Sequence, residues 1–223
     1  PQKVYYGYDT CDENADMVYT NQVVTDRRLD HSFGEHGFCT ACTTGYQPAE
    51  VVSATHHAEL AKTHAGYYAI ENGGQLSWFG RLAGKDGTVN GVLTADVVLN
   101  TGDLLSYNGV SEVTWRTWDP IGNGYSGKFD GNGHTVSGMF INNISQDYVG
   151  LFGVLNTGAI VSNVNVENFY IFADMYVGGV CGTNNGTIVN SQSNGMIYGY
   201  LEVGGICGRN TGRVEDCISD TEV

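Results

Sequence analysis

The chain has 223 residues, with 24 acidic side chains against 10 lysines and arginines, and its formal net charge at pH 7 is −14. This charge argues against nucleic-acid binding, which requires cationic side chains at the phosphates, and it disfavours anionic membrane surfaces in the same way. The sequence contains no run of about 20 apolar residues, so we expect no membrane insertion within this chain. Its 32 glycines and only 3 prolines fit a fold with many tight turns.

Residues 1–50 are predicted to form a small irregular segment, because four metal-ligand residue types lie close together in it. His31, His36, Cys39 and Cys42 have the spacing H-x4-H-x2-C-x2-C, which suits a structural zinc ion in tetrahedral coordination. The alternative is a disulfide in an oxidising compartment, either between Cys39 and Cys42 or between Cys11 and one of them. No other cofactor is expected.

Residues 51–66 are polar and rich in alanine, and we interpret them as a linker. His56, His57 and His64 lie in it and are expected to be solvated, because no H-E-x-x-H zinc motif occurs in the sequence. Residues 67–105 are predicted to cap the domain that follows, since a helix there covers strand edges that invite unwanted pairing. The expected elements are a strand at 67–70, a helix at 74–83 that Gly84 ends, and strands at 92–99 and 133–141.

Three stretches near the C-terminus repeat one another without a gap, at residues 149–160, 177–188 and 203–214. Their starting points lie 28 and 26 residues apart, which suits one coil of short strands and turns in a solenoid. Parallel strands on successive coils lie about 4.8 Å apart, so aligned side chains form ladders. The predicted ladders are Val149, Val177 and Val203; Phe152, Val180 and Ile206 inside; Asn156, Asn184 and Asn210 at a turn; and Cys181 with Cys207, either as packed thiols or as a disulfide.

Several motifs in residues 67–223 resemble the GLUG-motif repeat proteins, in essentially the order of that family. They are Tyr67-Tyr68-x-Ile70-x-Asn72-x-x-Gln75-Leu76-x-Trp78-Phe79, Leu93-Thr94-Ala95-Asp96, Trp118-x-Pro120-Ile121-Gly122, Gly127-x-Phe129-Asp130-Gly131-x-Gly133-His134-Thr135-Val136-Ser137-Gly138 and Tyr148-Val149-Gly150-Leu151-Phe152-Gly153. The resemblance implies a right-handed parallel β-helix, found in bacterial surface and secreted proteins and beside catalytic domains such as the immunoglobulin A1 metallopeptidases. We therefore expect an all-β fold, a right-handed parallel β-helix over residues 67–223, with a capping helix within 67–105 and GLUG-type repeats over 148–223.

Aromatic residues that the repeat does not explain are candidates for ligand binding. Trp115, Trp118 and Tyr125 lie within eleven residues, and flat aromatic faces stack on sugar rings and anchor protein partners. For Trp118 the favoured alternative is a core position beneath the turn at Pro120. Further aromatic surface is expected from Tyr107, Tyr148, Tyr176, Tyr198 and Tyr200.

The predicted function is a non-catalytic spacer or adhesin, secreted or on the bacterial cell surface, that presents a preorganised face to a glycan or a host or cell-surface protein. The first alternative is an accessory domain of a larger secreted hydrolase or metallopeptidase. The second is a polysaccharide-cleaving β-helix, which needs a base and paired carboxylates in one groove. Asp96, Asp130 and His134 are interpreted as turn residues instead, so we expect no catalytic residues in this chain.

Overall fold

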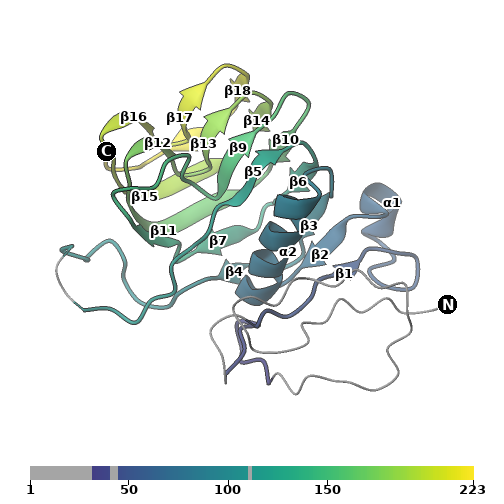
Figure 1. The fold of residues 1–223 in the computed structure, drawn as a ribbon. Helices are drawn as coiled ribbons and strands as arrows, with labels where there is room; N and C mark the ends of the chain where they lie inside the picture. The colour runs from purple at the N-terminus through teal and green to yellow at the C-terminus, as the bar shows by residue number, and fades with distance from the viewer. Residues whose placement is uncertain (1–31, 41–44, 110–111) are drawn as a thin grey trace.

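The computed structural model describes residues 32–40, 45–109 and 112–223, and from residue 68 onward the chain winds into a parallel β-solenoid (Figure 1). One sheet, which we call the first sheet, contains six parallel strands. At its edge β1 (Glu50–Val51) pairs antiparallel with the first of them. The six are β2 (Tyr68–Ile70), β3 (Gly91–Leu93), β6 (Lys128–Asp130), β10 (Ile160–Ser162), β14 (Thr187–Val189) and β18 (Arg213–Glu215). The predicted all-β parallel solenoid is confirmed.

Each coil then passes through further sheets before it returns to the first sheet. The second sheet contains β4 (Val97–Val98), β7 (Thr135–Ser137), β11 (Asn165–Phe172), β15 (Gln192–Tyr198) and β19 (Ile218–Ser219), and β8 (Phe140–Asn142) also pairs with β11. The third sheet contains β5 (Ile121–Tyr125), β9 (Phe152–Leu155), β13 (Cys181–Asn184) and β17 (Cys207–Asn210). The pair β12 (Met175–Gly178) and β16 (Leu201–Gly204) completes the later coils.

Two long predicted strands are each divided in the structure. Residues 92–99 form β3 and β4, which belong to different sheets, and residues 133–141 contain β7 and the start of β8. Gly138 lies between these last two strands at a φ of 77°, and a Cβ there would meet the carbonyl oxygen of Asn100. The prediction over residues 92–99 was wrong because the coil turns from one sheet to another there, and the prediction over 133–141 was wrong because Gly138 interrupts the strand within one sheet.

A helix, α2 (Gly73–Lys85), is present where the sequence predicted one at residues 74–83. It begins at Asn72, whose side-chain oxygen accepts a hydrogen bond from the backbone N–H of Gln75. Gly84 lies inside the helix and does not end it. The buried face of α2 packs against β5, where the Phe79 ring contacts the Tyr125 ring edge to face. A one-turn helix, α1 (Ala61–His64), lies within the predicted linker.

The valine ladder predicted from the repeat is confirmed. Val149 pairs with Val177 and Val177 pairs with Val203, so the three residues lie in one column on successive coils. Val149 and Val177 are fully buried, and Val203 on the last full coil is half-buried. The recurring stretch therefore corresponds to one coil, and its aliphatic side chains build the continuous core.

The alignment of the first two repeats without a gap was wrong by one residue. Phe152 pairs with Cys181 rather than standing beside Val180, and Leu155 pairs with Asn184. The second coil has one extra residue before this strand and two fewer in the following turn, so Ile160 pairs with Thr187 rather than with Ile188. The later repeats align as predicted, because Cys181 pairs with Cys207 and Asn184 with Asn210. The column inside the third sheet is therefore Ile121, Phe152, Cys181 and Cys207.

A column of left-handed residues forms the corner that follows each strand of the first sheet from β6 to β18. Asn132, Asn163, Asn190 and Asp216 have φ angles of 52°, 54°, 50° and 51°. Asparagine and aspartate tolerate this conformation better than other side chains do. The amide of Asn190 donates to Asn163 Oδ1 at 2.6 Å, and Asn163 Nδ2 donates to Asp130 Oδ1 at 2.9 Å. These bonds link the corners of successive coils.

Candidate functional site

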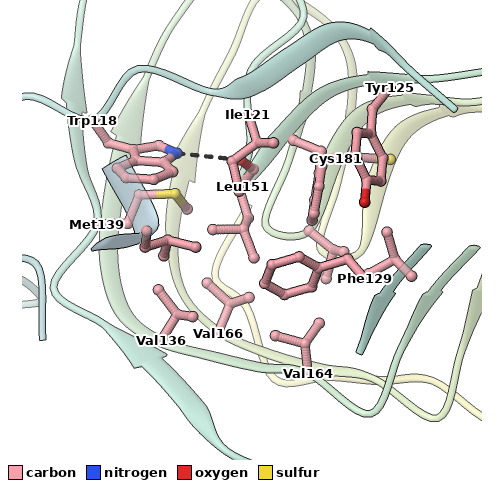
Figure 2. Packing of buried hydrophobic residues seen from close by; sticks show 14 of the residues in the cluster. Trp118, Ile121, Tyr125, Phe129, Val136, Met139, Leu151, Val164, Val166 and Cys181 are labelled. Carbon is pink, nitrogen blue, oxygen red and sulfur yellow. Dashed lines mark hydrogen bonds between the residues drawn. The ribbon is translucent and has the colours of Figure 1, made fainter. Parts of the chain in front are cut away.

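Two of the three aromatic residues singled out in the sequence lie in the core (Figure 2). The Trp118 side chain is 4% exposed, and its indole N–H donates to the Leu151 carbonyl at 3.3 Å. Tyr125 is fully buried, its hydroxyl donates to the Val89 carbonyl at 2.9 Å, and burial raises the pKa of that hydroxyl. The core position that the sequence favoured for Trp118 is therefore present, and a ligand role of Trp118 and Tyr125 stays a prediction.

Trp115 is half-buried on the segment that precedes β5. Its ring packs edge to face on Tyr107, with 5.6 Å between ring centroids, and on Phe140 at 5.3 Å. The indole N–H donates to the Thr101 carbonyl at 3.0 Å, which fixes the orientation of the ring. Trp115 thereby anchors the segment between β4 and β5 against β8 in the second sheet.

From Trp115, aromatic rings continue across the coils on the outer side of the second sheet. Phe140 stacks on Tyr170 of the next coil, with centroids 5.8 Å apart and an angle of 26° between the ring planes. The ring centroid of Tyr170 lies 5.7 Å from that of Tyr198 on the following coil. We call this set the aromatic strip; its members are Tyr107, Trp115, Phe140, Tyr170, Phe172 and Tyr198.

The aromatic strip is covered at one end and open at the other. Phe140 and Tyr170 are buried beneath Tyr107 and Trp115, and burial, together with the neighbouring tyrosine hydroxyls, raises the pKa of Tyr170. At the open end, Phe172 and Tyr198 are 38% and 41% exposed and meet edge to face at 6.4 Å. Tyr200, just beyond them, is 84% exposed. An apolar patch of this kind on a protein surface is typical of an interaction site.

A separate pocket joins Trp115 and Trp118, which the sequence had placed together. Its volume is ≈ 370 Å³, and Phe38, Tyr46 and Arg116 are among its other lining residues. The Arg116 guanidinium lies over the Phe38 ring, 4.5 Å from its centroid, in a cation–π contact. The pocket thus lies where Phe38 and Tyr46 meet the solenoid. Tyr125 does not line it.

The predicted zinc ligands are described only in part, because His31 and Cys42 lie outside the described residues. Cys39 is buried, with 3% of its surface exposed, and its backbone N–H donates to the Gly45 carbonyl. Within residues 32–40, 45–109 and 112–223, no three His, Cys, Asp or Glu side chains are grouped closely enough to share a metal ion. Zinc binding by His31, His36, Cys39 and Cys42 together stays a prediction.

His64 was expected to be solvated, and this was wrong. Its side chain is 15% exposed, and Nε2 lies 2.9 Å from a carboxylate oxygen of Asp130. Burial acts to raise the pKa of Asp130, but hydrogen bonds from Asn163, the backbone of Asn132 and His64 outweigh it, so the pKa is lowered. The pair ties α1 to the first sheet across 66 residues of sequence, a contact with no local signal.

The turn role predicted for Asp96 and Asp130 agrees with their hydrogen bonds. Asp96 Oδ1 accepts from the backbone N–H of Thr135 at 3.0 Å and lies 3.2 Å from His134 Nδ1. The hydrogen bond from Thr135 is the main cause that lowers the pKa of Asp96. Asp130 Oδ1 accepts from the backbone N–H of Asn132 at 2.8 Å. Both carboxylates therefore hold corners of the coil.

Comparison with known proteins gives two partial similarities. Over 113 residues, 48% of this chain and 1% of the relative, the chain is 36% identical to halomucin of Haloquadratum walsbyi. Over 79 residues, 33% of this chain and 9% of the relative, it is 39% identical to a putative Gly-rich membrane protein of Evansella cellulosilytica. The chain thus spans a small fraction of either relative. No protein family model and no solved structure matches the chain.

The sequence did not single out Phe140, Tyr170 and Phe172 as members of a binding surface. Tyr170 pairs with Phe140 of the previous coil, and Phe172 pairs with Tyr198 of the next. An aromatic residue that recurs at the spacing of one coil is the signal that would have found them.

Among the described residues, no helix is long and apolar enough to cross a membrane.

Proposed function

We propose that this chain is a non-catalytic module of a surface-associated protein, in which the β-solenoid is a rigid spacer and the aromatic strip binds a partner protein. The single observation that carries the proposal is the open end of the aromatic strip, where Phe172 and Tyr198 are exposed side by side and the exposed Tyr200 follows in the sequence. Exposed aromatic side chains on a rigid scaffold are the residue types that dominate protein interfaces.

The geometry of the open end favours a protein over a glycan. Phe172 and Tyr198 meet edge to face, with an angle of 84° between the ring planes. A sugar ring stacks best on a flat and isolated aromatic face, whereas a protein side chain packs into the angle between two rings. Leu201, 49% exposed, adds aliphatic surface close by in the sequence. Glycan binding by the aromatic strip is the alternative outcome of the test.

The wider setting of the module is part of the same proposal. One relative is named as a putative Gly-rich membrane protein, which supports a place at the cell surface, and both relatives are far longer than this chain. The hydrogen bonds of Asp96 and Asp130 to corner residues support a structural rather than catalytic role for the two carboxylates. We also assign α2 as the cap of the solenoid, since it packs on β5 at the edge of the third sheet.

The test is a binding screen of the purified chain against extracellular matrix proteins and a glycan array. The strongest interaction is then titrated with Tyr198→Ala and Phe172→Ala variants, for which we expect a loss of about 2 kcal/mol, or about 30-fold in Kd. Val51→Ala is the matched control, because Val51 is an exposed apolar residue, 44% accessible, on the first sheet. Unchanged binding by both strip variants, or a strip that binds only glycans, would contradict the proposal.

The absence of catalysis is tested separately. The purified chain is incubated with neutral and acidic polysaccharides and with a peptide library, and the products are analysed by mass spectrometry. We expect no cleavage above that of a heat-denatured sample. Cleavage that Asp130→Asn abolishes would show that the pair of His64 and Asp130 is part of an active site.

A further inference from the structure

A second column of left-handed residues lies on a different side of the solenoid from the aromatic strip. Tyr148, Tyr176 and Glu202 occupy equivalent positions on three coils, and their φ angles are 58°, 57° and 53°. Each precedes a Val-Gly pair in the sequence. A positive φ is uncommon for a bulky side chain, and strained residues of this kind concentrate at sites of function.

The two tyrosines form a parallel stack that follows the rise of the coils. Their ring centroids are 4.7 Å apart, and the ring planes differ by only 6°. On the third coil the stack continues with Arg209, whose guanidinium lies 5.9 Å from the ring centroid of Tyr176 in a cation–π contact. Arg209 Nε also lies 3.7 Å from a carboxylate oxygen of Glu202. One face of Tyr148 is covered by Tyr176, and no other ring contact of Tyr148 occurs among the described residues.

An open groove of ≈ 500 Å³ lies beside this stack on the outer side of the third sheet. Its floor is a register column, in which Asn123, Val154, Thr183 and Arg209 follow one another on β5, β9, β13 and β17. Tyr148 lines it on one side. Its remaining lining residues are Asn185 and Thr211, and the Thr211 hydroxyl donates to Asn185 Oδ1 at 2.6 Å.

Thr183 forms part of the floor of the groove, but its hydroxyl is enclosed. The residue is 7% exposed, lines the groove, and its hydroxyl has no hydrogen-bond partner within the described residues. This hydroxyl has essentially no accessible surface, so a ligand seated in the groove does not reach it. The polar groups that the groove offers to a ligand are the side-chain amides of Asn123 and Asn185.

We propose that this groove binds a neutral oligosaccharide. The open side of Tyr148 offers a ring face on which a sugar can stack, while the amides of Asn123 and Asn185 offer donors and acceptors for its hydroxyls. The one cation in the groove, Arg209, is paired with Glu202. Because the chain also carries a net charge of −14, the groove does not favour an acidic glycan. This site lies on another sheet and does not depend on the aromatic strip.

The experiment is isothermal titration calorimetry of the full chain with hexasaccharides of cellulose, xylan, mannan and chitin, and with hexagalacturonate as the acidic probe. We expect at least one neutral hexasaccharide to bind with a Kd below about 1 mM. Its affinity should change by less than about twofold between low and high salt, since screening acts only on charge pairs. Binding by hexagalacturonate alone, with a steep salt dependence, would overturn the proposal, as would no binding by any probe.

Two variants separate a binding role from a structural one. Asn123→Ala removes an exposed amide from the floor of the groove, so we expect affinity to fall about fivefold or more while Tm changes little. Tyr148→Asn removes the ring but keeps a residue that tolerates a positive φ, and it should abolish stacking. Tyr198→Ala, in the aromatic strip, is the control and should bind the same hexasaccharide as the unmodified chain does. Unchanged affinity in Asn123→Ala and Tyr148→Asn would refute the assignment.

Discussion

The corner ladder gives the sharpest stability prediction, with Asn163→Ala as the change. This substitution removes a hydrogen bond to the Asp130 carboxylate at 2.9 Å and one from the Asn190 amide at 2.6 Å. Asn163 is half-buried, so we take the lower ends of the usual ranges, about 1.5 kcal/mol for the charged partner and about 0.5 kcal/mol for the neutral one. Alanine at a φ of 54° adds about 1 kcal/mol of backbone strain. The expected loss in the free energy of unfolding is about 3 kcal/mol.

Asn163→Gly separates the two contributions. Glycine loses the same hydrogen bonds but adopts a positive φ without strain, so its expected loss is about 2 kcal/mol. Both values come from urea denaturation followed by tryptophan fluorescence, with an unchanged m-value as the check that the folded and unfolded states are comparable. Equal losses in the two variants would refute the strain argument. A loss below about 1 kcal/mol in Asn163→Ala would refute the contribution of the ladder itself.

Three further predictions concern the core, pH and the thiols. Phe152→Ala should lower the free energy of unfolding by about 3–5 kcal/mol, and Phe152→Leu by clearly less, because the Phe152 ring lies between two other aromatic rings in the interior. Equal losses of unfolding free energy in the two variants, measured by calorimetry, would contradict this packing. The pKa of Asp130 is lowered in the folded chain, so its ionised carboxylate stabilises the fold above the unfolded pKa of about 3.9. This contribution is lost as pH falls through the folded pKa. Asp130→Asn should therefore show a smaller loss of stability between pH 5 and pH 3 than the unmodified chain. A hydrogen bond from Cys181 lowers the pKa of Cys207, whereas burial raises the pKa of Cys181. Iodoacetamide at pH 8 should therefore modify Cys207 before Cys181, as followed by peptide mass spectrometry. Earlier modification of Cys181 would be inconsistent with the register.

The fold was predictable to the extent that the coil repeats in the sequence. Val149, Val177 and Val203 recur before glycine, and each coil must bury the same aliphatic side chain, so the column followed directly. The one-residue slip at Phe152 was not predicted, because one extra residue and two missing residues within one coil change its length by only one residue. The corner between β3 and β4 was not predicted either, because Thr94, Ala95 and Asp96 include neither glycine nor proline, the residues that mark turns most strongly.

The candidate sites were less predictable, because side-chain direction depends on register. Trp115 was found through aromatic density, but the same reasoning included Tyr125, whose ring the strand alternation turns into the core. The contact of His64 with Asp130 and the stack of Tyr148 on Tyr176 both join residues far apart in the sequence. Only the positions of successive coils bring such residues together, and sequence spacing alone does not fix them.

The central claim is that successive coils stack in parallel and in register, and methyl-labelled nuclear magnetic resonance tests it most directly. In the first sheet Val161 pairs with Ile188, and Ile188 pairs with Val214. We expect nuclear Overhauser contacts between each of these neighbouring methyl pairs and none between Val161 and Val214, which are two coils and about 10 Å apart. A direct contact between Val161 and Val214, or the absence of both neighbouring contacts, would contradict the solenoid and the two surfaces built on it.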